Sequence, residues 1–324
     1  MNIQQNITIR RYSIAPEDFR VHVIDGLGKL PKALSPRFFY DERGSELFER
    51  ITRLPEYYLT ETEKSLLRSN AGQISRLLPE GGITIIEPGS GNSEKAEILF
   101  DHLPEIIRYV PIEISGEHLE ERCENLGGRY PAIEIIAIDA DYMDPRISGE
   151  QIITDGFTPV IFFPGSSLGN YEPGEAQRVL EHFRALAGGD VWLLIGIDLK
   201  KDRKTLERAY NDSAGVTAAF NKNLIERMRN ELGADIDPQD FEHRAIYNPD
   251  KGRIEIYLVA KRAFKVSISG YTFAFESGEP ILTEYSHKYS VDEFYELASK
   301  AGFSPVKTFC DEGELFSVHL MKAE

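Results

Sequence analysis

Short and almost continuously apolar segments recur through the middle of the chain, separated by stretches with helical periodicity. Five of them are rich in isoleucine and valine: Ile83–Glu87, Tyr109–Ile114, Ile133–Asp139, Pro159–Phe163 and Val191–Ile197. This pattern is typical of strands that are buried on both faces of a parallel sheet. The alternation of strands and helices predicts a doubly wound α/β sheet, with right-handed crossovers and a ligand site at the carboxyl ends of the strands.

Residues 201–286 follow a different pattern. A helix is predicted over Ala218–Leu232, where apolar residues recur four apart. β-like runs follow at Arg253–Ala260, Phe264–Ile268 and Tyr271–Phe275, and the last two are spaced as a hairpin. This segment is typical of an α+β piece that is inserted into an α/β unit.

The α/β pattern resumes near the C-terminus. Ser290 to Glu293 reads as a capping box before a helix, and terminal strands are predicted at Ser304–Cys310 and Leu315–Met321. A strand, a helix and an antiparallel last strand are how the Rossmann-like sheet of a class I methyltransferase ends. We therefore expect two domains: an α/β domain formed by residues 61–200 and 287–324, and a second, α+β domain formed by residues 1–60 and 201–286.

Composition narrows the classes of partner. With 37 basic and 53 acidic residues the formal charge is −16, which repels phosphate backbones and anionic lipid, so we expect no nucleic acid. No apolar run has the length of a membrane span, and we expect no signal peptide. Two widely separated cysteines predict reduced thiols in a cytoplasmic protein. The histidines and cysteines form no ligand cluster in the sequence, so we expect no bound metal. We also expect a monomer.

A glycine-rich turn follows the first predicted strand. Gly89 and Gly91 lie where a βα turn must come close to a ligand, and glycine permits both the positive φ and the close approach that this requires. Ser93 stands where a dinucleotide fingerprint has its third glycine. The glycine pair alone is weak support, because ordinary tight turns also contain it.

Acidic residues follow the next two strands. Glu113 can accept hydrogen bonds from ribose hydroxyls, and Asp141 beside Tyr142 suits an adenine ring, although either acid alone is also typical of a solvated strand end. Together they favour an adenosine ligand, either NAD or S-adenosylmethionine. The missing third glycine and the acid–aromatic pair favour S-adenosylmethionine. Lys95, in the first turn of the next helix, can pair with its methionyl carboxylate or be a surface lysine.

Several longer motifs resemble one family over nearly the whole chain. They are similar to the histidine Nα-methyltransferases of ergothioneine biosynthesis at Phe39–Phe48, Ile51–Tyr58, Gly89–Lys95, Gly165–Asn170, Arg208–Asn221 and Leu282–Lys288. The resemblance implies an enzyme that transfers three methyl groups from S-adenosylmethionine to the α-amine of histidine, giving hercynine. It also implies that the amino acid is held between a methyltransferase domain and a substrate domain.

The resemblance assigns roles to individual residues. It implies cofactor binding by Tyr40, Gly89, Gly91, Lys95, Glu113, Asp141 and Tyr142. It implies that Asn170 and Tyr210 hold the carboxylate and amine end of the substrate as the catalytic pair, with Gly165 in the same site. Around the imidazole it implies Tyr57, Ile256, Glu284 and Ser286, where Ile256 replaces a methionine of the family.

Other interpretations stay open from the residues alone. Asn170 also fits a helix N-cap, Tyr210 a core tyrosine, and Glu284 with Ser286 one solvated face of a strand. The same scaffold could methylate another amino acid such as tryptophan or tyrosine. An NAD-dependent oxidoreductase is a further alternative, but the sequence lacks the third glycine of the dinucleotide fingerprint. A non-catalytic adenosine-binding module is another, but it would not need the long motifs.

Overall fold

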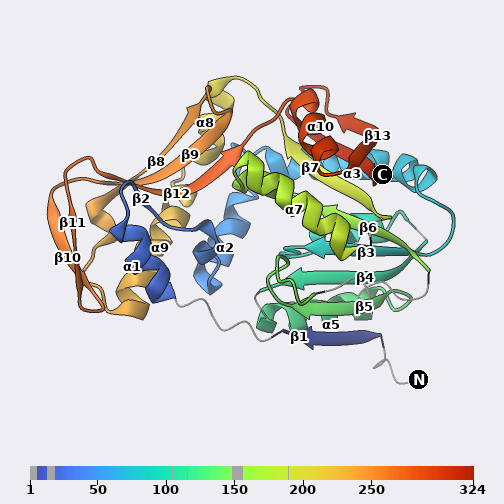
Figure 1. Cartoon of the computed structure of the whole chain (residues 1–324), viewed down its shortest axis with the longest axis horizontal. Helices are drawn as coiled ribbons and strands as arrows, with labels where there is room; N and C mark the ends of the chain where they lie inside the picture. Colours follow the sequence, from blue (N-terminus) through green and yellow to red (C-terminus); the bar gives the residue numbers. More distant parts are fainter. Residues whose placement is uncertain (1–5, 13–18, 104, 115, 148–155, 189) are drawn as a thin grey trace. The chain divides into compact units, whose positions relative to one another are not determined.

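The structure is a computed structural model that describes residues 6–12, 19–103, 105–114, 116–147, 156–188 and 190–324, with only the backbone described at 116–118. The chain folds as two compact units, which are coloured by sequence in Figure 1. Unit 1 comprises Met1–Ile14, Glu61–Leu199 and Tyr289–Glu324, and unit 2 comprises Ala15–Thr60 and Lys200–Lys288. Each unit is described by itself.

Unit 1 is built on an eight-stranded sheet with the order β1-β5-β4-β3-β6-β7-β14-β13. All neighbouring strands are parallel except β14, which runs antiparallel to both β7 and β13. The strands are β1 (Ile7–Arg11), β3 (Ile83–Pro88), β4 (Ile106–Glu113), β5 (Glu134–Asp139), β6 (Thr158–Phe163), β7 (Trp192–Asp198), β13 (Phe303–Cys310) and β14 (Phe316–Ala323).

Burial explains why these strands read as apolar runs. Every residue of β3 and β7 is buried, because helices cover the sheet. The helices of this unit are α3 (Leu59–Leu77, which begins in unit 2), α4 (Glu94–Phe100), α5 (Gly116–Arg129), α7 (Pro173–Leu186) and α10 (Val291–Lys300). The five central strands and the doubly wound class are confirmed, and the capping box of α10 is present at Ser290 and Glu293.

The strand order places a topological switch point between β3 and β6. From β3 the chain moves through β4 to β5, and it then returns to the other side of β3 to form β6. The loops that follow β3 and β6 therefore diverge at the carboxyl ends of two paired strands, where open α/β sheets bind their ligands.

One N-terminal segment differs from the expectation that residues 1–60 belong with the second domain. Strand β1 pairs in parallel with β5, from Ile7 opposite Ile135 to Arg11 opposite Asp139, and so joins unit 1. The glycine at position 127 makes room for Ile7, because an added Cβ there would lie 2.8 Å from the Ile7 side chain. A five-residue strand has too weak a hydrophobic pattern for its partner to be read from sequence.

Unit 2 combines a four-stranded sheet, a separate hairpin and helices. The sheet order is β2-β12-β9-β8, and the hairpin of β10 and β11 is confirmed. A core of residues from α9 and the two sheets, including Phe220, Leu224 and Phe241, holds the unit together. Its elements are α1 (Phe19–Gly28), β2 (Lys32–Ala33), α2 (Glu42–Ile51), α8 (Arg203–Tyr210), α9 (Val216–Leu232), β8 (Phe241–Asn248), β9 (Arg253–Ala260), β10 (Phe264–Ile268), β11 (Tyr271–Phe275) and β12 (Pro280–His287).

Two kinds of feature are absent from the described residues. Among them, no helix is long and apolar enough to cross a membrane. The same residues contain no group of three histidine, cysteine, aspartate or glutamate side chains placed to hold a metal ion.

Candidate functional site

The glycine turn of unit 1 adopts the conformation that its sequence requires. Gly89 and Gly91 have φ of 66° and 50°, in the left-handed region where a side chain is strained. The Gly89 amide donates to the carbonyl of Ile112 on β4, at 2.8 Å, which folds the turn over the end of the sheet. A Cβ on Gly89 would lie 3.6 Å from the ring of Tyr142, so the turn runs beside that ring.

Glu113 is tied directly to this turn. Its carboxylate accepts hydrogen bonds from the amide of Gly91 at 3.1 Å and from the amide of Ile114 at 2.9 Å. The half-buried carboxylate thus lies at the end of β4, next to the glycine turn. These contacts bring together two residues that the sequence predicted for the cofactor.

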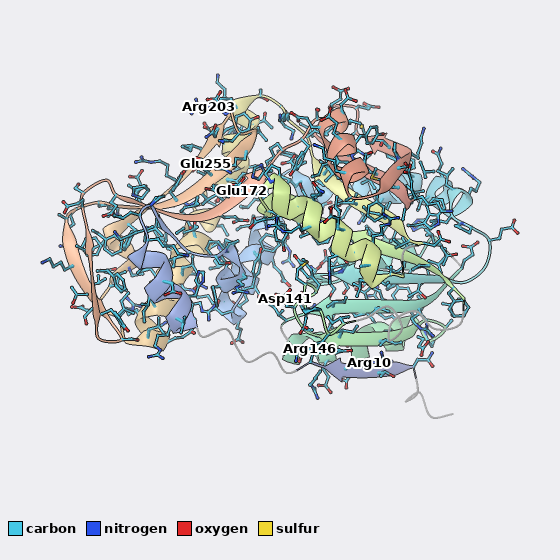
Figure 2. All side chains as sticks on the ribbon, in the orientation of Figure 1. Arg10, Asp141, Arg146, Glu172, Arg203 and Glu255 are labelled. Carbon is cyan, nitrogen blue, oxygen red and sulfur yellow. The ribbon has the colours of Figure 1, made fainter. Side chains whose placement is uncertain are left out.

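Asp141 and Tyr142 follow β5, and Figure 2 labels Asp141 beyond the end of that strand. The Asp141 carboxylate accepts a hydrogen bond from the amide of Met143 at 2.8 Å, which fixes its direction. The Tyr142 ring packs against Phe163 and Phe183, and its hydroxyl is hydrogen-bonded to that of Tyr171. Burial raises the pKa of Tyr142 well above its usual value, so this residue presents a neutral ring.

A buried acid lies directly before the glycine turn. Glu87 is the fifth residue of β3, and burial raises its pKa to about 8 despite a hydrogen bond from the Tyr109 hydroxyl. The same hydroxyl lies 2.9 Å from that of Ser93, the residue that replaces the third glycine. Ser93 itself has φ of 58°, so a serine adopts the left-handed conformation here.

Lys95 has a partner that sequence reasoning missed. Its Nζ lies 2.5 Å from Oε2 of Glu63, a residue of α3 that is 1% exposed. Both oxygens of the Glu63 carboxylate also accept the amide hydrogen of Gly165, at 3.0 and 2.9 Å. The amide of Gly165, another predicted site residue, is therefore used within the protein.

Asn170 ends the short 3-10 turn Ser167–Asn170 that follows β6. It is not the N-cap of α7, because that position is held by Glu172 in a capping box with Glu175. Within the part of the chain that the structure describes, the Asn170 amide has no hydrogen-bond partner. An amide with open donors and an open acceptor can bind a carboxylate and an amine at once.

Unit 2 carries a polar cluster on one face of β12. Glu284, Ser286 and Lys288 alternate along the chain, so their side chains share one side of the strand and its continuation. The Ser286 hydroxyl lies 2.9 Å from that of Tyr210, and the buried Lys288 ammonium donates to both oxygens at 2.8 Å. The ring of Tyr57 meets the Tyr210 ring edge-on, with centroids 5.9 Å apart.

The register of the sheet adds the last predicted residue. Ile256 on β9 lies opposite Glu284 on β12, and paired residues share a face. Burial raises the pKa of Glu284 to about 7, although the positive charge of Lys288 opposes the shift. The structure thus brings Tyr57, Tyr210, Ile256, Glu284 and Ser286 together in unit 2. Lys288 is the last residue of the Leu282–Lys288 motif, but the sequence predicted no role for it.

Tyr40 also belongs to unit 2. It is 36% exposed, and its ring packs edge-on against Phe48 and Phe220 with centroids 5.6 and 5.7 Å apart. These contacts involve the Tyr40 ring and do not test its role toward the cofactor, which stays a prediction.

The residues of unit 1 fit an adenosine cofactor. Left-handed glycines allow close backbone approach at the switch point, and Glu113 and Asp141 offer carboxylate acceptors at successive strand ends. A doubly wound sheet of this order with this turn defines a class I methyltransferase. More narrowly, the chain belongs to the histidine-specific, S-adenosylmethionine-dependent methyltransferases, a family that matches residues 19–323.

Individual relatives support this membership. The chain is 37% identical to a histidine N-alpha-methyltransferase of Mycolicibacterium smegmatis, over 94% of this chain and 95% of that protein. It is equally similar, at 37%, to the Mycobacterium tuberculosis protein of the same name, over 93% and 94%. It is 31% identical to ergothioneine biosynthesis protein 1 of Neurospora crassa, over 90% of this chain but 33% of that longer protein.

Family membership confirms three predictions. The chain is an enzyme, its cofactor is S-adenosylmethionine, and the resemblance drawn from its motifs is correct. An NAD-dependent oxidoreductase and a non-catalytic adenosine-binding module are thereby set aside. The roles of the individual site residues stay predictions.

Proposed function

We propose that this enzyme transfers three methyl groups from S-adenosylmethionine to the α-amine of L-histidine and releases hercynine for ergothioneine biosynthesis. The observation that carries the choice of histidine is the cluster on β12, where Glu284 and Ser286 offer an acceptor and a hydroxyl on one face. The names of the mycobacterial and fungal relatives point to the same reaction and pathway.

Unit 1 supplies the cofactor side of the proposal. S-adenosylmethionine, when bound, provides a methyl group on a sulfonium, which makes that group open to attack by an amine. Gly89 and Gly91 would allow close backbone contact, and Glu113 would accept hydrogen bonds from the ribose hydroxyls. Asp141 would accept from the adenine amine, while the neutral ring of Tyr142 stacks beside it.

The amine must be neutral to attack, because its lone pair is the nucleophile. A carboxylate next to the amine would favour the ammonium form, whereas neutral side chains do not. Asn170 and Tyr210 are both neutral, and each can donate or accept a hydrogen bond. We propose that they hold the carboxylate and amine of the substrate and leave the nitrogen free to rotate between successive transfers.

Recognition of the carboxylate has its own test. If Asn170 grips it, Asn170→Ala should weaken histidine binding and leave the affinity for S-adenosylhomocysteine near normal. Histamine, which lacks the carboxylate, should be a poor substrate for the wild type. Equal turnover of histamine and histidine would exclude this role for Asn170.

We propose that Glu284 and Ser286 bind the imidazole. The Glu284 carboxylate would accept the ring N–H, and Ser286 would be oriented by Lys288 and Tyr210. A site built around a ring N–H rejects analogues that leave its polar groups unpaired. Ile256 supplies an apolar wall opposite Glu284, and Tyr57 an aromatic one beside Tyr210.

A second candidate is Nα-methylation of tryptophan or tyrosine on the same scaffold. Time-resolved mass spectrometry with equal amounts of histidine, tryptophan and tyrosine separates the two. We expect wild type to convert histidine through mono- and dimethyl intermediates to the trimethyl product, and Glu284→Ala to lose that turnover. Glu255→Ala, on the opposite face of the same sheet, is the matched control and should keep the preference for histidine. A wild type that stops at one methyl, or prefers tryptophan, contradicts the proposal.

We also propose that the enzyme works as a cytoplasmic monomer and binds no nucleic acid. The formal charge of −16 and the two free cysteines, Cys123 and Cys310, support this. Light scattering after gel filtration should give a mass near 36.7 kDa. A mass of twice that value contradicts the monomer.

A further inference from the structure

The end of α8 is fixed to the edge of the unit 2 sheet by two side chains. Tyr210 is the last residue of α8, so its carbonyl needs a partner outside the helix, and His243 on β8 supplies one with Nε2 at 2.8 Å. The next residue, Asn211, donates its side-chain amide to the carbonyl of Ala245 at 2.9 Å and accepts from the Ala245 amide at 3.2 Å. Because β8 is the last strand of its sheet, Asn211 takes the place that a further strand would occupy.

The tautomer of His243 follows from its second partner. The side-chain nitrogen of Asn221, on α9, lies 3.0 Å from the carbonyl oxygen of Tyr257 and 2.9 Å from Nδ1 of His243. A carbonyl can only accept, so the Asn221 group that faces it is the NH2 and not the oxygen. The other hydrogen of this NH2 is donated to Nδ1, which is therefore unprotonated. The proton of the neutral imidazole is on Nε2, from which it is donated to the Tyr210 carbonyl.

The surroundings of His243 favour this neutral ring. Burial lowers the pKa of His243, although its hydrogen bond to the Tyr210 carbonyl opposes the shift. A second proton, on Nδ1, would point at the NH2 of Asn221, where it meets no acceptor. The ring is therefore a fixed donor to the end of α8.

Tyr210 is also held at the other end of its side chain. Its hydroxyl lies 2.9 Å from that of Ser286 on β12 and 2.8 Å from the ammonium of Lys288, which follows that strand. Strands β8 and β12 lie on either side of β9 in the sheet. The carbonyl of Tyr210 is thus fixed from one of these strands and its hydroxyl from the other.

We propose that His243 is a positioning residue for the reaction: it fixes the backbone of Tyr210, and Asn221 fixes the tautomer that this requires. Tyr210 and Asn221 lie near the two ends of the motif Arg208–Asn221, so His243 joins parts of the chain that the sequence singled out together. The inference rests on the proposed role of Tyr210. It does not depend on histidine as the substrate, because every α-amino acid carries the same carboxylate and amine.

Two variants of equal length test the donor at position 243. Glutamine can place a side-chain NH2 near the position of Nε2, whereas methionine has no donor. On the full chain with S-adenosylhomocysteine bound, we expect His243→Met to lose about five- to tenfold in calorimetric affinity for L-histidine, the size of one hydrogen bond, and His243→Gln to retain most of it. Both variants should bind S-adenosylhomocysteine like the wild type, because its predicted ligands on the sheet of unit 1 are unchanged.

A double variant shows whether His243 acts through Tyr210. When Tyr210→Phe has already removed the hydroxyl, His243→Met should cost little further affinity. The matched control is His22, another histidine of unit 2, whose Nε2 accepts the amide hydrogen of Ser35 at 2.8 Å. His22→Met loses a hydrogen bond of the same kind away from Tyr210, so it should bind L-histidine like the wild type.

The tautomer is measured on the wild type and needs no variant to fold. Long-range proton–nitrogen NMR of ¹⁵N-histidine-labelled protein distinguishes the two neutral tautomers, and we expect the Nε2–H form for His243, assigned as the signal absent from His243→Gln. The proposal is overturned if His243 carries its proton on Nδ1, if His243→Met binds like the wild type, if His243→Gln is as impaired as His243→Met, if the losses of Tyr210→Phe and His243→Met add, or if His22→Met is equally impaired. If Tyr210→Phe itself binds L-histidine like the wild type, the proposed role of Tyr210 fails and this inference fails with it.

Discussion

We expect the ionised form of Glu284 to lower the free energy of unfolding of the enzyme. Burial raises the pKa of this carboxyl from 4.5 to about 7, even though Lys288 opposes the shift. One pKa unit corresponds to about 1.4 kcal/mol, so ionised Glu284 costs about 3 kcal/mol of folding free energy. Because the pKa is raised on folding, this cost is absent below about pH 4.5, grows as the pH rises, and is complete above about pH 7.

Glu284→Gln removes the titrating group and keeps its shape. We expect the variant to be as stable as wild type near pH 4.5 and about 3 kcal/mol more stable near pH 8, while it loses histidine turnover. Urea unfolding at several pH values measures the difference. Far-UV circular dichroism follows the whole chain, and the single tryptophan, Trp192 on β7, follows unit 1, so the two signals separate the transition of unit 2.

Glu255, on the paired strand β9, is a control for which we expect the opposite change in stability. Burial alone would raise the pKa of Glu255, but hydrogen bonds from Tyr257 and Arg253 outweigh it and the pKa is lowered. Glu255→Gln should therefore destabilise the protein at neutral pH, and this effect should fade as the pH falls through the lowered pKa. A stability difference between wild type and Glu284→Gln that does not change with pH would refute the reasoning.

Three further predictions concern the two sets of site residues. Gly91→Val should abolish S-adenosylhomocysteine binding while the fold survives, because φ of 50° and close approach both exclude a branched side chain; unchanged calorimetric affinity would remove this turn from the site. Asp141→Ala should weaken the same binding by about 1–3 kcal/mol through one unpaired adenine donor, and a loss far below that would place the adenine elsewhere. Lys288→Met removes the charge that lowers the pKa of Glu284, so the pH at which the KM for histidine changes should move upward. If this pH is the same in the variant and the wild type, Lys288 does not influence the ionisation of Glu284.

The parts of the fold that could be predicted from sequence are those where burial is uniform. Strands such as β3 and β7 are buried at every position, and their continuous apolar runs show it. Strand β8 could not be predicted, because only Phe241 and Ala245 of its eight residues are buried and the exposed Glu242 and Arg244 lie between them, so it contains neither an apolar run nor a regular alternation. Its place in the sheet depends on pairing with β9 over eight residues, from Phe241 opposite Ala260 to Asn248 opposite Arg253.

Some residues of the candidate site could be predicted from sequence and others could not. Residues at strand ends, such as Glu113 and Asp141, could be predicted because the carboxyl edge of a parallel sheet has a defined function. Glu63 could not, because a charged residue in an amphipathic helix is usually solvated, and its partner Lys95 lies 32 residues away. Lys288 was missed for a similar reason, since a buried lysine is rare and no pattern along a strand identifies one.

The missing third glycine has a physical explanation in the structure. Ser93 takes φ of 58°, a conformation that is strained for a residue with a Cβ, at the N-cap of α4. It is 2% exposed, and its hydroxyl lies 2.9 Å from that of Tyr109, which also donates to Glu87. A glycine would relieve the strain but would leave this buried hydroxyl pair incomplete, and losing a buried partner costs about 1–3 kcal/mol. The serine therefore ties the turn to β3 and β4, which a third glycine could not do.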